Sequence, residues 1–164
     1  MKVIVCDASP LIFLAKLNRL HLISDVLQGR VSVLKCVVDE VSSENAGVTE
    51  TKRLGAFLDS VEIVDFQAPE WSSKALSQSD QSTLTWAIEH RADWLVADER
   101  LLRRVAREEG ISTVGFLGIL VEAARQELLL PTEAKEAIDE SISRHGCRIS
   151  VDLYRRILSE LNGL

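Results

Sequence analysis

The chain has 164 residues, of which 46% are hydrophobic and 27% are charged, a balance that fits one folded domain and excludes an intrinsically disordered protein. Its 19 Lys and Arg residues stand against 25 Asp and Glu residues, which gives a formal net charge of −6. This charge excludes a protein that holds nucleic acid through a basic field over its whole surface. A nucleic-acid ligand would therefore require a local basic patch or a metal ion.

The three cysteines, Cys6, Cys36 and Cys147, are far apart and form no C-x-x-C motif, which argues against a zinc site. An odd number of cysteines with no secretory signal is typical of a reducing cytosol. No apolar run reaches the roughly 18 residues that a membrane span needs. We therefore expect a cytoplasmic protein with no membrane segment, folded as a single domain over residues 1–164, in which residues 131–164 form a C-terminal helical extension.

In the first half of the chain, short β-branched runs alternate with segments of helical periodicity. Ser9 followed by Pro10 predicts a helix N-cap and the first helical residue. The patterns predict, in order, a strand at 3–6, helices at 10–17 and 20–27, a strand at 31–33, helices at 37–43 and 51–58, and a strand at 61–64.

The second half continues this alternation. The patterns predict a helix at 77–90, a strand at 94–97, a helix at 100–109 that ends at Gly110, a strand at 111–114, and helices at 118–127, 131–145 and 151–161. Buried strands that alternate with helices are typical of parallel βαβ units. The expected fold class is therefore α/β, with a mainly parallel sheet covered by helices on both faces.

Two acidic residues, Asp7 and Asp98, come directly after the first and the fourth predicted strand. Ligands of parallel sheets bind beyond the carboxyl ends of the strands, so these acids are candidates for one site. Glu40 and Asp80 lie near predicted helix starts and extend the acidic set. Each acid also has a structural alternative: Asp98 as a helix N-cap, Asp80 in a capping box with Ser77, and Glu40 as a solvated helical acid.

Metal-assisted hydrolysis of phosphodiester bonds is the chemistry that uses such a set of acids. Mg²⁺ takes oxygen ligands, usually one or two carboxylates together with waters and substrate phosphates. Several carboxylates that converge without a cation would repel one another and become partly protonated. A cluster of these acids therefore implies either a metal ion or a bound basic group.

Four segments resemble, in order, the motifs of the PIN-domain family, in the branch whose first motif reads D-[AT]-S-P-L-I. The segments are DASPLI at 7–12, VVDEV at 37–41, SDQ at 79–81 and LVADERLLRRVA at 95–106. Further similarity at 115–120 and 146–150 extends the resemblance over nearly the whole chain. Two positions differ from the usual pattern: Leu34 stands where the branch has Pro, and Ser79-Asp80 stands where it has Gly-Glu.

This resemblance implies a three-layer α/β/α fold and a ribonuclease that depends on Mg²⁺ or Mn²⁺. The motif acids Asp7, Glu40, Asp80 and Asp98 would hold the metal and carry catalysis through a metal-activated water. The hydroxyl of Ser9 would support a ligand or a metal-bound water. Because Asp80 is one methylene shorter than the usual Glu, it would act directly or through a water, and Glu99 is an alternative ligand or supporting group.

Many proteins of this branch resemble the toxin of a VapBC-type pair, in which an antitoxin blocks the acidic site and dimers are usual. The resemblance thus implies an RNA substrate, a cognate antitoxin and a homodimer. Another class of function stays open, a catalytically weak PIN-like module that acts by binding a partner or RNA. The Ser79-Asp80 difference and the acidic net charge favour that alternative.

Four arginines recur at helical spacing directly after Asp98, which predicts that they share one side of a helix: Arg100, Arg103, Arg104 and Arg107. They could guide RNA phosphates toward the acids. The alternative is a solvated face that is paired with Glu108 and neighbouring acids.

Overall fold

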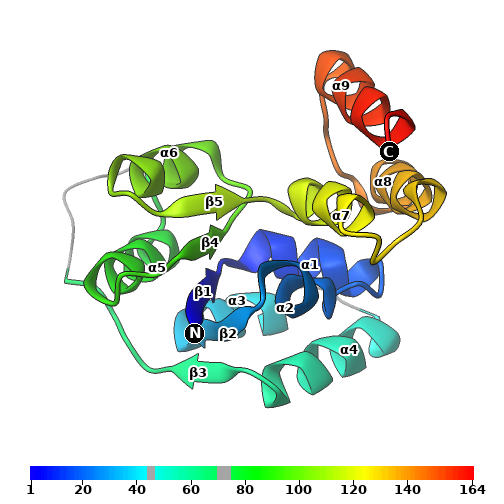
Figure 1. The fold of residues 1–164 in the computed structure, drawn as a ribbon. Helices are drawn as coiled ribbons and strands as arrows, with labels where there is room; N and C mark the ends of the chain where they lie inside the picture. Colours follow the sequence, from blue (N-terminus) through cyan, green and yellow to red (C-terminus); the bar gives the residue numbers. More distant parts are fainter. Residues whose placement is uncertain (44–46, 70–74) are drawn as a thin grey trace.

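A computed structural model of the chain describes residues 1–43, 47–69 and 75–164. Its sheet has five parallel strands in the order β3-β2-β1-β4-β5 (Figure 1). The strands are β1 (Lys2–Cys6), β2 (Gly29–Leu34), β3 (Glu62–Val64), β4 (Trp94–Val96) and β5 (Ser112–Val114). This parallel sheet confirms the α/β fold class.

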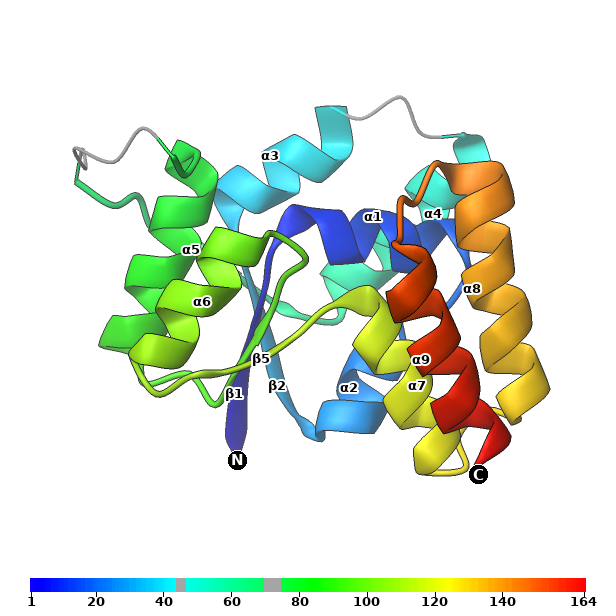
Figure 2. The ribbon, with the colours of Figure 1, turned by 90° about the horizontal axis from the view of Figure 1, so that it is seen from above.

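Helices cover both faces of the sheet, which confirms the three-layer α/β/α arrangement. Helices α5 (Gln78–Glu89) and α6 (Arg100–Glu108) pack on one face, where they contact β1 and β5 (Figure 2). The other helices on the sheet lie across from them: α1 (Ala8–Lys16), α2 (Leu22–Leu27), α3 (Lys35–Ser43), α4 (Val48–Asp59) and α7 (Phe116–Arg125). Because both faces are covered, strand residues Ile4, Val5 and Cys6 are all fully buried.

The last two helices form the C-terminal part of the chain. Helix α8 (Pro131–His145) packs against α7 and α1, and helix α9 (Val151–Asn162) packs against α7 and α8 (Figure 1). Within the described ranges, every helix is too short or too polar to span a membrane. The three cysteines are free thiols, two of them buried.

The strand order fixes where a ligand site can form. The chain steps from β1 through β2 to β3 toward one edge of the sheet, and from β4 to β5 toward the other edge. Such a reversal leaves a crevice outside the carboxyl ends of the two strands between which it occurs. These strands are β1 and β4, and they are followed by Asp7 and Asp98.

Four helices, α1, α3, α4 and α7, begin two or three residues earlier than their sequence patterns predict, and two of these starts bear on the site. Helix α1 begins at Ala8, so Asp7 occupies the N-cap position and Ser9 lies in the first turn instead of capping the helix. Pro10 fits in that turn because the first amides of a helix have no intrahelical acceptor. Helix α7 begins at Phe116, not at residue 118, because a side chain from another part of the chain binds its first amide.

Candidate active site

Asp7 lies where β1 ends and α1 begins. Its amide donates to the carbonyl of Val96 at 2.9 Å, which continues the pairing of β1 with β4. Its side chain is 5% exposed and does not cap α1. The carboxylate oxygen Oδ1 is buried and has no hydrogen-bond partner among the described residues. Since a buried acceptor without a partner is costly, this atom is well placed for a ligand that brings positive charge.

Burial raises the pKa of the Asp7 carboxyl to about 8, and the negative charge of Asp80 adds to this increase. Hydrogen bonding to the Asp80 side chain and the negative charge of Glu40 raise the Asp7 pKa further. The Ala8 amide opposes the increase by hydrogen bonding to the carboxylate. Asp80 of α5 and the exposed Glu40 of α3 thus both lie within electrostatic reach of Asp7 at the start of α1. Without a cation, Asp7 is largely protonated at neutral pH.

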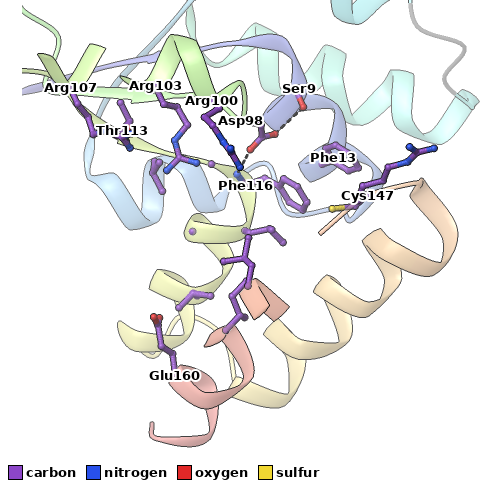
Figure 3. A pocket seen from close by; sticks show the side chains of 18 of the residues that line it. Ser9, Phe13, Asp98, Arg100, Arg103, Arg107, Thr113, Phe116, Cys147 and Glu160 are labelled. Carbon is purple, nitrogen blue, oxygen red and sulfur yellow. Dashed lines mark hydrogen bonds between the residues drawn. The ribbon is translucent and has the colours of Figure 1, made fainter. Parts of the chain in front are cut away.

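Asp98 lies just beyond β4 and uses both of its carboxylate oxygens. The hydroxyl of Ser9 donates to Oδ2 at 2.9 Å, and the amide of Phe116 donates to Oδ1 at 3.0 Å (Figure 3). Burial raises the pKa of the Asp98 carboxyl, while these two hydrogen bonds and the charge of Arg103 oppose the increase. Asp98 therefore joins the starts of α1 and α7 at the carboxyl edge of the sheet.

Asp98 does not cap the helix that follows it in the sequence. The N-cap of α6 is Glu99, whose Oε2 accepts a hydrogen bond from the Leu102 amide at 2.6 Å. Asp98 instead caps α7, where Gly115 is the N-cap residue. A Cβ atom on Gly115 would lie 2.6 Å from Asp98 Oδ1, so only glycine allows this approach.

The capping of α5 accounts for the spacing of Ser77 and Asp80 in the sequence. Ser77 caps this helix, and its hydroxyl oxygen accepts a hydrogen bond from the Asp80 amide at 3.0 Å. The amide of Asp80 thus takes part in the cap, while its carboxyl interacts with that of Asp7.

The motif acids form two connected groups. Asp7 lies within electrostatic reach of Asp80 and of the exposed Glu40, and Asp98 is hydrogen bonded to Ser9, two residues after Asp7. Across residues 1–43, 47–69 and 75–164, no three His, Cys, Asp or Glu side chains are arranged to hold one ion. The unpartnered Asp7 oxygen among like charges nevertheless fits a hard cation that takes one or two carboxylates and completes its shell with water and phosphate.

A cavity of about 700 Å³ opens beside Asp98 (Figure 3). Ser9 and Asp98 line one end, and the arginines Arg100, Arg103 and Arg107 line the α6 side. Arg104, the fourth member of the sequence stripe, does not line this cavity; it is 65% exposed and lies 4.0 Å from Glu108. Arg104 thus lies outside the cavity, because consecutive residues of a helix are about 100° apart around its axis and Arg104 follows Arg103 directly.

Three cavity residues are not among the predicted site residues, although Phe116 and Arg148 lie in segments that resemble the PIN branch. Phe13 and Phe116 stack with ring centroids 4.5 Å apart, and both line the cavity together with Arg148. These residues come from α1, from α7 and from the segment between α8 and α9. The packing of α7 against α1 and α8 brings them together, so no local pattern shows that they share one cavity.

Comparison with known proteins agrees with this geometry. The model of a family described as a PIN domain, DUF3368, matches residues 3–163. The fold is similar to that of a PilT N-terminus domain protein from the hyperthermophilic archaeon Sulfolobus solfataricus P2, with a TM-score of 0.54 and 16% sequence identity, over 74% of this chain and 92% of that chain. No curated protein sequence matches the chain significantly.

Proposed function

Because the chain belongs to the PIN-domain family, whose members are generally nucleases, we propose that it is an endoribonuclease that depends on Mg²⁺ or Mn²⁺. The observation that carries this proposal is the state of Asp7. A nearly buried carboxyl with an unpartnered oxygen, beside two further acids, has no evident structural purpose and suits a cation.

Asp7 and Asp80 would hold the metal, with Asp98 and Glu40 completing the acidic site. A bound divalent ion activates water and stabilises negative charge on phosphate oxygens. Ser9 and the Phe116 amide orient Asp98 through the two hydrogen bonds described above. Glu99 is engaged as the cap of α6, so we assign it a supporting role in positioning the Asp98 segment.

The wider setting that we propose is the toxin half of a type II toxin–antitoxin pair in the cytoplasm, acting as a homodimer with a cognate antitoxin. The support is the resemblance of the motifs to the VapC-like branch, together with three free thiols that suit a reducing compartment. A basic side chain of the antitoxin would satisfy the same unpartnered Asp7 oxygen that suits a metal.

A binding module without catalysis is the second candidate. The observation in its favour is that no three potential ligand side chains among the described residues are arranged around one point. The short Asp80 side chain at the position where this branch usually has Glu is consistent with this alternative.

Cleavage of a single-stranded RNA in Mn²⁺ separates the two candidates. We expect the wild-type protein to cut the RNA and Asp7→Asn to lose at least a hundredfold of the rate, because removing a group that acts in the chemical step typically costs about 10²–10⁴. Asp25→Asn on the exposed side of α2 removes the same charge and should cut normally. An intact protein that binds RNA and never cuts it would instead establish the binding module.

A further inference from the structure

The cavity beside Asp98 extends well beyond the acidic site. It runs along α6 and β5, crosses the start of α7, and ends at α9 (Figure 3). Its volume of about 700 Å³ lies in the range of pockets that enclose an organic ligand. We call this space, from Ser9 and Asp98 to Leu153 and Ile157, the α6–α9 groove.

The α6–α9 groove has an excess of positive charge in a protein whose net charge is −6. Its lining has two acids, Asp98 and Glu160, and five arginines, Arg100, Arg103, Arg107, Arg125 and Arg148. Arg125 is neutralised by ion pairs with Glu122 and Glu160. Among the described residues, the other four arginines form no ion pair within 4.0 Å, so the groove is suited to an anion.

The surroundings of Arg103 independently favour an anion as the ligand of the groove. Its Nε is buried and has no hydrogen-bond partner in the described part of the chain. Burial lowers the pKa of its guanidinium, as does the nearby charge of Arg107, while Asp98 opposes both effects. Two guanidiniums that repel each other in a partly buried site are stabilised by a phosphate, which accepts hydrogen bonds from both.

The rest of the groove is apolar and aromatic. Phe13 and Phe116 line it with their rings stacked on each other, Phe116 being 3% exposed, and Leu153 and Ile157 of α9 line it as well. Such a surface matches the face of an unstacked nucleobase, as in the recognition of single-stranded RNA. The arginines suit a phosphate and the apolar lining suits a flat base, so the groove suits a nucleotide.

We propose that the α6–α9 groove is a binding subsite for single-stranded RNA, holding a nucleotide that flanks the phosphate presented to the acidic site. The phosphate contacts Arg100, Arg103 and Arg107, and the base lies against the wall formed by α9. The claim that this nucleotide flanks the phosphate to be cut rests on the proposed nuclease function, because it takes Asp98, where the groove starts, as part of the active site. A duplex is excluded because its bases are stacked and paired and cannot enter a pocket of this size.

The test measures RNA binding without cleavage, by fluorescence anisotropy of a labelled eight-nucleotide RNA in EDTA. We expect Arg100→Gln and Arg107→Gln each to weaken binding about tenfold, as for the loss of one charge-assisted hydrogen bond. Each should also reduce the dependence of binding on salt. The slope of the logarithm of the binding constant against the logarithm of the salt concentration should become shallower by roughly 0.7, the value per phosphate contact for single strands. Arg104→Gln is the matched control, since it removes the same charge from the same helix outside the groove and should change binding less than twofold.

A second pair of variants tests the α9 wall. Leu153→Asp places a carboxylate in the groove and should weaken RNA binding at least tenfold, whereas Val151→Asp puts the same charge on an exposed position of the same helix and should not. Thermal melts establish that both variants fold. Arg100 and Arg107 are exposed, so their substitution does not disturb the core. The binding measurements on these two variants therefore test the proposal even if Leu153→Asp unfolds.

Three competitors identify the ligand: unlabelled single strand, the same sequence as a duplex, and a nucleoside 5′-monophosphate. Displacement by the single strand at least tenfold more readily than by the other two supports the proposal. Equal displacement by duplex, or binding of the free nucleotide with no RNA affinity, overturns it. So does binding of an acidic peptide in the groove in place of RNA.

Cleavage in Mn²⁺ is measured separately, which distinguishes the two proposals. If RNA binds in the groove but is never cut, only the proposed nuclease function is refuted. If substitutions at Arg100, Arg107 and Leu153 change neither cleavage nor binding, only the proposed RNA subsite is refuted.

Discussion

Asp7 and Asp98 are two aspartates at adjacent strand ends with opposite surroundings. Both oxygens of Asp98 accept hydrogen bonds, from Ser9 and from the Phe116 amide, and Asp98 also lies near the positive charge of Arg103. Asp7 has an unpartnered oxygen and faces Asp80 and Glu40. Hydrogen bonds thus hold the Asp98 carboxylate in place, whereas the Asp7 carboxyl has an oxygen free for a ligand and its charge depends on what binds beside it.

Replacing Asp7 by Asn should make the stability of the metal-free protein less dependent on pH. The Asp7 carboxyl has a pKa of about 8 in the folded chain, against about 3.9 in an unfolded chain, so the folded state holds an extra proton between these values. The contribution of Asp7 to the free energy of unfolding is therefore fully present below about pH 4 and is lost as the pH rises toward 8. Asn does not titrate and removes this loss.

Urea unfolding in EDTA at pH 5 and pH 8 measures this effect. Asp7→Asn should gain stability relative to wild type on going from pH 5 to pH 8, while the exposed Asp25→Asn variant should keep a constant difference. A difference between wild type and Asp7→Asn that is the same at both pH values would show that Asp7 is already ionised and paired in the folded protein.

The start of α7 is the element that connects the sheet edge to the C-terminal helices. Gly115 lets Asp98 approach the Phe116 amide, and Phe116 in turn stacks on Phe13 of α1. At the neighbouring helix, Glu99 caps α6 and directs the face with Arg100, Arg103 and Arg107 into the groove. Consecutive acids thus anchor two different helices, which fixes the groove relative to the acidic site.

Gly115→Ala should disturb both stability and RNA cleavage. The added Cβ would lie 2.6 Å from Asp98 Oδ1 and 3.4 Å from Arg103 Nη1, so the carboxylate must move from the α7 amide. We expect a loss of about 1–3 kcal/mol in the free energy of unfolding, as for other overpacked sites. Gly55→Ala is the matched control: no atom lies within 4 Å of its added Cβ, and inside α4 it should stabilise by about 0.5–1 kcal/mol. Urea unfolding of both variants checks this, and an equal effect at the two glycines would contradict the close approach.

At the scale of the whole molecule, an acidic protein presents one arginine-lined groove that leads to a site rich in carboxylates. The net charge of −6 would repel RNA at long range, so in the proposed function the groove would supply the attraction locally, and a bound cation would add to it. Metal binding should therefore affect both folding stability and RNA affinity.

Thermal melts with and without Mn²⁺ test whether metal binding stabilises the folded protein. An ion that binds only the folded chain adds about 2.7 kcal/mol at 100 times its Kd, which for a domain of this size raises Tm by about 5 to 10 °C. Asp7→Asn should blunt that rise, while Asp25→Asn should preserve it. Equal increases in Tm for wild type and Asp7→Asn would remove Asp7 from the set of metal ligands.

The sequence by itself determined the alternation of strands and helices, because apolar periodicity records which faces are buried. It also identified the four motif acids and located Asp7 and Asp98 directly after strands. The order β3-β2-β1-β4-β5 was decided only by the tertiary structure, since no local pattern encodes which strands become neighbours. The same holds for the Asp98 cap on α7, the position of Arg104 outside the cavity, and the groove formed with Phe13, Arg148 and α9. Each depends on contacts between residues far apart in the chain, which form only when the helices pack.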